Sequence, residues 1–320
     1  QNIIKKNIQS IKKVFTTILN TSEKNTAPIF IDNADWLTKL NYIQFLRDVG
    51  THFTINKMLT YDSVKLRLDR EQSLSYMEFN YMILQAYDFY QLYKNNNCIL
   101  QIGGSDQWGN IVNGVDLIRR MLQKEAYGLT SPLITLASGA KMGKTEKGAI
   151  WLNKDLLSPY EYWQFWRNTD DRDVERFLKF FTEIDIEEIN NITKKEKNIN
   201  NLKILLANEA TKLLHGDNAA KNSAQTAKDT FEDGKMGLNL PEIKIKLSVM
   251  KKGINIVDFI STSKILPSKS EVRRAIANRG FKINDITIDN EKKVLLLKDF
   301  EKDNFKLSYG KKKHYLVKFI

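Results

Sequence analysis

The chain of 320 residues is poor in several residue types on which whole classes of protein depend. Its single cysteine, Cys98, excludes internal disulfides, and its strand-like surroundings place it in the core of a protein from a reducing compartment. The three histidines are scattered along the chain, which excludes a zinc constellation, so we expect no tightly bound protein metal. No apolar run approaches the length of a membrane span, which argues against a membrane protein.

Positive charge is concentrated at one end of the chain. The formal net charge is +12, and residues 251–320 alone hold 17 lysines and arginines against 8 aspartates and glutamates, a net charge of +9. A concentrated basic segment favours a polyanionic partner, with RNA or DNA as the first candidates. General alkalinity of a lysine-rich chain is the alternative.

The local sequence of this basic segment favours a nucleic-acid-binding module. The spacing predicts a helix, a turn, and a second helix capped by Ser268 or Ser270. Lys269, Arg273 and Arg274 lie near the start of the second helix and share one basic face. The short alternating runs that follow predict strands. Such a unit would lay cationic side chains on a phosphate backbone.

The stretch IGGSDQWGN at residues 102–110 joins a predicted strand to a predicted helix. At such a turn in an open α/β sheet, the strand ends leave a crevice and the helix start offers unpaired N–H groups to anions. Gly103 and Gly104 allow close approach of a sugar or phosphate, and Asp106 can accept hydrogen bonds from hydroxyls. A plain glycine turn with Ser105 or Asp106 as helix cap is the alternative.

The stretch KMGKT at residues 141–145 places two lysines on a glycine-containing loop. It has the residue order of a P-loop, but Gly139 and Gly143 enclose three residues where a Walker loop has four, and no long amphipathic helix follows. A P-loop nucleotidase is therefore the weaker hypothesis. Lys141 and Lys144 suit instead a clamp on a pyrophosphate leaving group, whose charge grows in the transition state. A solvated lysine loop is the alternative.

A long helix rich in aromatic residues is predicted at residues 73–95. Within it Tyr81, Gln85 and Asp88 are spaced i, i+4 and i+7, which places them on one stripe. A phenol, an amide and a carboxylate on one stripe of an apolar helix predict a pocket that recognises polar groups of a small ligand. A core helix whose Asp88 faces solvent explains the spacing as well.

The rest of the chain predicts mostly helices. Before the aromatic helix we expect a basic amphipathic helix at residues 1–15, a strand leading into a loop at 29–36, and two helical segments within 42–59. After KMGKT we expect helices at residues 158–182, 194–216 and 222–233, and a linker at 236–250.

The motifs NYMILQAYDF, LQIGGSDQWGN and KMGKT in this order, followed by the basic SKSEVRR segment, resemble the bacterial and organellar tyrosyl-tRNA synthetases, which are class I aminoacyl-tRNA synthetases. The resemblance covers nearly the whole chain. It implies an α/β fold with a Rossmann-like parallel-sheet catalytic domain in residues 1–150, ending in the KMGKT loop. It further implies a helical anticodon-binding region in residues 151–235, the linker at 236–250, and a small α+β RNA-binding domain in residues 251–320.

The resemblance assigns the helical stripe to a tyrosine pocket. Tyr81 and Gln85 would hold the ammonium of the substrate, and Asp88 would accept a hydrogen bond from its phenol hydroxyl. Phenylalanine would leave that buried carboxylate unpaired, a discrimination for which this family is the standard example. Three further residues match positions beside the pocket: Asn33, Trp36 and Gln101.

The resemblance assigns the other two motifs to ATP. The backbone of Gly104 and the carboxylate of Asp106 would hold the ribose, and Gln107 would contact the reacting carboxylate or the adenylate. The KMGKT loop would stabilise the pyrophosphate as it closes, through Lys141, Lys144 and Thr145. The implied reaction activates L-tyrosine with ATP and Mg²⁺ to tyrosyl-adenylate, then transfers tyrosine to tRNA(Tyr) without a covalent enzyme intermediate.

The family also implies a homodimer with its interface around residues 42–76, and a location in the bacterial cytoplasm or an organellar matrix. In the basic domain, Lys269, Arg273 and Arg274 would contact RNA. A catalytically inactive RNA-binding protein descended from a synthetase is the main alternative, and a P-loop nucleotidase is the weaker one.

One element of the family pattern does not occur in the sequence. The family carries a strand, a His-Ile-Gly-His type signature and a phosphate-binding loop early in the catalytic domain, and no such stretch occurs here. The chain begins without methionine, in a segment that resembles the helix after those elements. We therefore expect an N-terminally incomplete chain that lacks the first parallel strand and the adenine site, inactive alone although the full-length protein is active.

Overall fold

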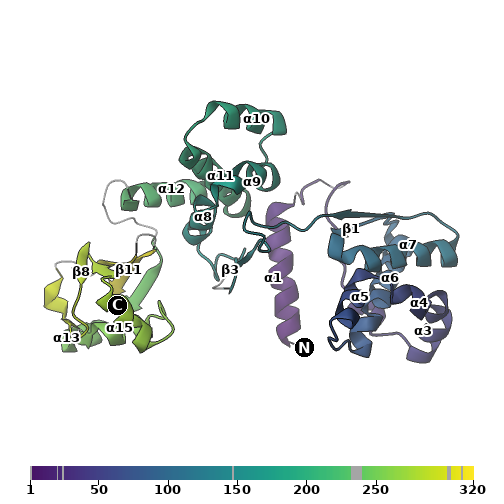
Figure 1. Cartoon of the computed structure of the whole chain (residues 1–320), viewed down its shortest axis with the longest axis horizontal. Coiled ribbons are helices and arrows are strands. Elements are labelled where there is room, and N and C mark those ends of the chain that lie inside the picture. The colour runs from purple at the N-terminus through teal and green to yellow at the C-terminus, as the bar shows by residue number, and fades with distance from the viewer. Residues whose placement is uncertain are drawn as a thin grey trace. The chain divides into compact units, whose positions relative to one another are not determined.

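The structure, a computed structural model, describes residues 2–19, 21–23, 25–145, 148–231, 240–300, 304–310 and 313–320. Contacts within it divide the chain into two units, residues 28–142 and residues 1–27 together with 143–320 (Figure 1). The four-part division expected from the sequence places its first boundary at residue 150. It divides the chain by the function that the resemblance implies for each part. That division stays a prediction.

Residues 28–142 are organised around a βαβ motif. Strand β1 (Leu100–Gly104) pairs in parallel with β2 (Tyr127–Ser131), and helix α7 (Trp108–Leu122) connects them. Helix α6 (Tyr76–Asn96) packs along α7 (Figure 1). The smaller elements of this unit are α2 (Ala34–Leu37), α3 (Tyr42–Asp48), η1 (Gly50–His52), α4 (Ile55–Met58), α5 (Asp62–Asp69) and η2 (Ser105–Gln107).

The core of this unit lies between α6 and α7. The side chains of Ala86, Phe89, Leu117 and Ile118 are buried there with no more than 1% of their surface exposed. A Cβ added to Gly114 of α7 would lie 2.9 Å from Cδ1 of Phe89. The two helices therefore approach more closely at this point than any side chain at position 114 would allow.

The predicted strand near the start of this unit is wrong. Residues 28–32 have no regular secondary structure and belong to no sheet of the described chain, and the short helix α2 begins at Ala34. The polar side chains that follow are held by hydrogen bonds to α6, and these contacts need no sheet partner. Cys98, predicted in the core, is only half-buried.

The second unit begins with α1 (Asn2–Ile18) and resumes at Gly143, within the KMGKT loop, after which helices pack around aromatic side chains. Its helices and short strands are β3 (Lys144–Thr145), β4 (Gly148–Ala149), α8 (Pro159–Arg167), η3 (Asp171–Asp173), α9 (Val174–Phe181), α10 (Ile186–Lys195), α11 (Ile199–His215) and α12 (Asp217–Phe231). Trp163, Trp166, Phe177 and Leu206 are buried among them. The second region is thus helical, as the sequence predicted.

All three helices predicted after the KMGKT loop have different bounds, and the one predicted at residues 222–233 begins earlier, at Asp217. The helix predicted at residues 158–182 is divided, because the Asp170 carboxylate accepts from the backbone N–H of Arg172 at 3.0 Å and starts the new turn η3 before α9. The helix predicted at residues 194–216 begins only at Ile199, since residues 194 and 195 complete the preceding helix α10.

The C-terminal residues form an α+β module with a five-stranded sheet in the order β5-β11-β10-β7-β8. Its elements are β5 (Glu242–Ile245), α13 (Leu247–Lys252), β6 (Ile254–Asn255), α14 (Ile256–Thr262), α15 (Lys269–Ala277), β7 (Phe281–Ile283), β8 (Ile286–Ile288), β9 (Val294–Leu295), η4 (Leu297–Asp299), β10 (Asn304–Tyr309) and β11 (Lys313–Phe319). Ser268 caps α15 by accepting from the N–H of Glu271, as predicted.

The predicted linker at residues 236–250 needs correction. Residues 232–239 lie outside the described part of the chain. Residues 242–245 form β5, which pairs in parallel with β11, and α13 follows directly. The glycine and proline that suggested a linker precede an edge strand of the module. In the described part of the chain, no helix has the length and apolarity needed to cross a membrane.

Helix α6, which carries the residues predicted to bind tyrosine, begins with a capping box. The backbone N–H and the hydroxyl of Ser75 donate to the Glu78 carboxylate at 2.9 and 2.7 Å, and Arg67 donates to it at 3.0 Å. These bonds, the backbone N–H of Ser75 first, lower the pKa of Glu78 from 4.5 to about 2. The bonds favour the charged carboxylate only in the folded chain.

We therefore predict that Glu78 stabilises the fold above pH 4.5, the unfolded pKa, and that this contribution falls as pH decreases toward 2. Glu78→Gln should lower the thermal midpoint at pH 7, and the difference from the parent chain should shrink steadily as pH falls from 4.5. Thermal unfolding followed by circular dichroism at a series of pH values measures this. Glu187→Gln, in the first turn of α10, is the matched control. A Glu78→Gln difference that stayed constant with pH would contradict the assignment.

Candidate active site

Asp88 on α6 is the best-supported polar group of the predicted pocket. Its Oδ2 accepts from Nδ2 of Asn33 at 2.9 Å, and its Oδ1 accepts from Nε1 of Trp36 at 2.7 Å. Asn33 occupies the N-cap position of α2, yet its side chain makes no cap bond because it is turned toward Asp88. The half-buried carboxylate thus has one donor on each oxygen and one acceptor site left on each. The alternative in which Asp88 merely faces solvent is wrong.

A second hydrogen-bonded group joins α6 to the glycine motif. Nδ2 of Asn110 donates to Oε1 of Gln85 at 3.0 Å and to Oε1 of Gln107 at 3.2 Å. Nε2 of Gln107 in turn lies 3.4 Å from Oδ2 of Asp106. The structure therefore brings together three predicted residues, Gln85, Asp106 and Gln107, through a fourth that sequence reasoning missed. Asn110 is the last residue of the IGGSDQWGN motif. Its position three residues after Gln107 in a predicted helix indicates that the two side chains can meet.

Two other predicted pocket residues are not connected to these groups. The Tyr81 side chain is 59% exposed and makes no hydrogen bond with another described residue. Gln101 lies on β1, and its Oε1 is buried without a hydrogen-bond partner among the described residues. A buried acceptor without a donor is unfavourable unless a ligand or water supplies one. The Gln101 acceptor is thus buried and unsatisfied among the described residues.

The glycine motif forms the predicted strand-to-helix turn. Gly104 ends β1 in an extended conformation, and η2 and α7 follow. Neither η2 nor α7 has a side-chain hydrogen bond at its N-cap. The structure therefore does not show the plain capped turn with Ser105 or Asp106 as the cap. A Cβ at Gly104 would lie 2.7 Å from Oδ1 of Asp106. Cδ2 of Leu133 would lie 3.0 Å away, so a side chain at position 104 would displace the Asp106 carboxylate and crowd Leu133.

Two short antiparallel backbone pairings contain the KMGKT residues. Lys141 bridges Thr135, and the backbone of β3 pairs with that of β4 in an antiparallel hairpin. A Walker loop requires a helix after its Lys-Thr pair, so this hairpin makes the P-loop hypothesis wrong. The chain passes from one unit to the other between Met142 and Gly143. The side chains of Lys144 and Thr145 lie outside the described residues, so their predicted roles stay predictions.

The three predicted RNA-binding residues lie on α15 of the C-terminal module. Nζ of Lys269 lies 2.7 Å from Oδ1 of Asp258, and Nε of Arg273 lies 3.8 Å from Oε2 of Glu291. Arg274 donates to the hydroxyl of Ser270 at 3.5 Å. These ion pairs are more than half-exposed on the basic side, so they are weak and can be exchanged for phosphate contacts.

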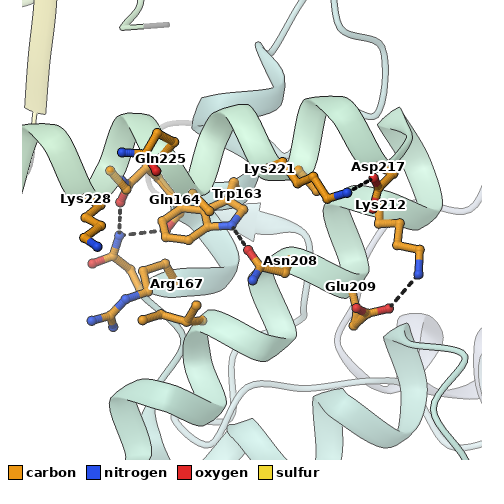
Figure 2. A pocket seen from close by; sticks show the side chains of 15 residues that line it. Trp163, Gln164, Arg167, Asn208, Glu209, Lys212, Asp217, Lys221, Gln225 and Lys228 are labelled. Carbon is orange, nitrogen blue, oxygen red and sulfur yellow. Dashed lines mark hydrogen bonds and ion pairs between the residues drawn. The ribbon is translucent and has the colours of Figure 1, made fainter. Parts of the chain in front are cut away.

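A pocket of about 790 Å³ lies in the helical region, between α8, α11 and α12. Figure 2 shows Trp163 inside it, with its Nε1 donating to Oδ1 of Asn208 at 2.8 Å. Lys221 pairs with Asp217, and Lys212 with Glu209. Two further cations on its wall, Arg167 and Lys228, make no ion pair with a described residue.

The described residues contain no group of three or more His, Cys, Asp or Glu side chains placed to hold a metal ion. The polar groups at the turn and on α6 are amides and isolated carboxylates instead. They suit hydrogen-bonded recognition of a small polar ligand.

Comparison with known proteins gives one consistent result. Residues 2–232 match the family model of tRNA synthetases class I (W and Y). The chain is 59% identical over 317 residues to a tyrosine–tRNA ligase from Pelagibacter ubique, an alignment that spans 99% of this chain and 77% of the relative. It is 53% identical over 318 residues to a tyrosine–tRNA ligase from Zymomonas mobilis, spanning 99% and 76%.

The chain belongs to the tyrosine–tRNA ligase family. Among solved structures it resembles a C-terminally truncated mitochondrial tyrosyl-tRNA synthetase from Aspergillus nidulans, with a TM-score of 0.57 and 32% sequence identity. That match covers 70% of this chain and 66% of the other, just under two thirds. The family membership confirms the Rossmann-like class I fold, and ATP is the nucleotide substrate of class I synthetases. The hydrogen bonds at Asp88 and Asn110 lie within the residues that match the family model.

Proposed function

We propose that residues 28–142 hold L-tyrosine for activation by ATP and that Asp88 selects it. The observation that carries the proposal is the pair of N–H donors from Asn33 and Trp36, one on each carboxylate oxygen of Asp88. They fix the plane of the carboxylate and leave a free acceptor position for a phenol hydroxyl. Phenylalanine lacks that hydroxyl and would leave the acceptor unpaired.

The remaining groups suit the polar end of the amino acid and the ATP. The ammonium would lie near Tyr81 and Gln85, and Gln101, whose buried Oε1 has no partner among the described residues, would lie beside the pocket. Gln107 would contact the carboxylate that attacks the α-phosphorus, and Gly104 with Asp106 would hold the ribose. Lys141, Lys144 and Thr145 would stabilise the pyrophosphate, with Mg²⁺ bound by the ATP phosphates. Chelation of Mg²⁺ should then stop ATP–pyrophosphate exchange.

In the complete gene product, Asp88→Ala should lower the ratio of kcat/KM for tyrosine to that for phenylalanine by about a hundredfold or more, because the acceptor for the hydroxyl is lost. Tyrosine- and phenylalanine-dependent ATP–pyrophosphate exchange measures the ratio. The control is Asp35→Asn, which changes an exposed carboxylate in the first turn of α2. It should leave the ratio of kcat/KM values unchanged. An unaltered ratio in Asp88→Ala would show that the pocket is misassigned.

We further propose that tRNA(Tyr) binds the basic C-terminal module and the helical region. The cations of α15 are exposed, and the pocket between α8, α11 and α12 carries Arg167 and Lys228 without carboxylate partners among the described residues. These are contacts that phosphates can satisfy. The catalytically inactive alternative needs the same surfaces and differs only in lacking tyrosine activation.

Replacing Lys269, Arg273 and Arg274 together by alanine should raise KM for tRNA roughly tenfold at moderate salt and flatten its salt dependence, because fewer counterions are released. ATP–pyrophosphate exchange should not change. Aminoacylation and exchange assays on the same preparation measure both. Exchange activity in the parent protein excludes the inactive RNA-binding alternative, and loss of exchange in the variant would contradict a role limited to tRNA.

We also propose a homodimer whose interface includes the start of α6. Tyr42, Ile43, Tyr76 and Met77 are each more than half-exposed, and the hydroxyls of Tyr42 and Tyr76 lie 2.7 Å apart. An exposed cluster of this kind marks an interaction surface. A location in the bacterial cytoplasm or an organellar matrix goes with the proposal and is tested by fractionation of the native cells.

Sedimentation equilibrium should give a mass twice that of one chain for the parent protein. Met77→Asp should shift it to the monomer, because a charge would be buried without a partner. Ile286→Asp, on an equally exposed apolar residue of the C-terminal module, is the control and should stay dimeric. A monomeric parent protein would refute the proposal.

A further inference from the structure

Asn110 has no role in the functions proposed above, yet it occupies the centre of their hydrogen bonds. It is the third residue of α7 and is half-buried. Its side-chain nitrogen donates to Oε1 of Gln85 at 3.0 Å and to Oε1 of Gln107 at 3.2 Å. An amide nitrogen carries two hydrogens, so both are used in these two bonds.

The two bonds decide which way the glutamine amides face. A free glutamine amide can turn over, presenting either its oxygen or its NH₂ group to a ligand. With each oxygen held by Asn110, turning over would bring two NH₂ groups together and lose a hydrogen bond. Gln85 and Gln107 therefore keep their NH₂ groups directed away from Asn110, and each oxygen keeps one free lone pair.

The position of Asn110 is itself fixed by packing on both sides. A Cβ at Gly109 would lie 3.0 Å from the ring of Tyr61, and one at Gly114 would lie 2.9 Å from Phe89. The first turn of α7 is thus in close contact with Tyr61, the N-cap residue of α5, and the next turn is in close contact with α6. A group held on a rigid helix in this way can orient its neighbours without touching the substrate.

We propose that Asn110 is a positioning residue for tyrosine activation, which sets the amide orientation of Gln85 and Gln107. The proposal rests on the function proposed above. Nε2 of Gln107 lies 3.4 Å from Oδ2 of Asp106, which takes one of its two hydrogens. The other hydrogen then meets the negative carboxylate of tyrosine, whereas the amide oxygen would repel it. The free lone pair on Gln85 remains available to the ammonium. Asn110 acts through these two residues and makes no contact of its own with the reacting atoms.

In the complete gene product, Asn110→Ala should lower kcat/KM for tyrosine in ATP–pyrophosphate exchange about tenfold, a loss in line with two neutral hydrogen bonds. Asn110→Asp should lower it further, because a carboxylate can accept only from the NH₂ groups and so turns both amides over. The thermal midpoint of Asn110→Asp should not fall, since an acid in the first turn of a helix is favourable. A merely structural role would lower stability along with activity.

The matched control is Asn95→Asp. Asn95 donates to Oε1 of Gln91 at 3.2 Å on the same helix as Gln85, at the opposite end of α6 from its capping box. The chemistry of the contact is the same, but it lies outside the proposed site. Its kcat/KM for tyrosine should stay within about twofold of the parent value.

A double-mutant cycle decides the mechanism. In a Gln85→Ala, Gln107→Ala background, Asn110→Ala should cost less than about twofold, because its partners are gone. The same tenfold loss in that background would overturn the proposal. If the two glutamine variants impair exchange but Asn110→Ala does not, only this inference falls. If the glutamine variants leave exchange unchanged, the proposed tyrosine pocket falls with it.

Discussion

The contact between Phe89 and Gly114 sets the spacing of helices α6 and α7, which carry several polar groups of the candidate site. Phe89 is fully buried on α6, and its ring occupies the space that a side chain on Gly114 of α7 would need. One turn earlier on each helix, Gln85 meets Asn110 at hydrogen-bond distance. Both contacts advance by four residues, so the helices run side by side in the same direction. Any widening at Gly114 would also lengthen the Gln85 to Asn110 bond.

This packing leaves α6 with an apolar side and a polar flank. Met82, Ile83, Ala86, Phe89 and Tyr90 are buried, while Gln85 and Asp88 lie half-buried beside them. A carboxylate in that position is costly unless it is hydrogen-bonded, and Asn33 and Trp36 supply the two donors. The donors come from a segment without strand pairing in the described chain. The side-chain bonds to α6 are what hold that segment in place.

The sequence predicted the elements of this site better than their connections. Periodicity located α6, and the apolar run before the glycines located β1, because both patterns depend on local side-chain alternation. Tyr81, Gln85 and Asp88 lie on one helix, as the spacing predicted. Their contacts differ, since the Tyr81 side chain makes no hydrogen bond with a described residue and the Asp88 carboxylate accepts two. Such differences depend on which distant segments arrive beside the helix, and no local pattern contains that information.

The errors have the same origin. Residues 29–36 have the β-branched composition of a strand, but a strand forms only with a partner, and no described segment pairs with them. Residues 242–245 follow a glycine- and proline-containing stretch that reads as a linker, but β11, more than 70 residues later, provides them with a partner. Asn110 was overlooked because a short polar side chain in the first turn of a helix has an adequate local explanation.

The KMGKT motif is continuous in sequence but does not belong to a single structural unit. Its five residues fall on both sides of the passage between the two units, with Lys141 in one and Lys144 in the other. Gly143, at this passage, has a φ of +82°, which an L side chain rarely adopts, and a Cβ there would have nothing within 4 Å. Glycine is therefore needed for backbone conformation and not for close packing. At Gly104 the reverse holds, since its φ of −73° is ordinary and a Cβ there would crowd the side chains of Asp106 and Leu133. The two glycine motifs thus serve the structure in different ways, one through its backbone conformation at Gly143 and the other by letting the Asp106 carboxylate lie close to the backbone at Gly104.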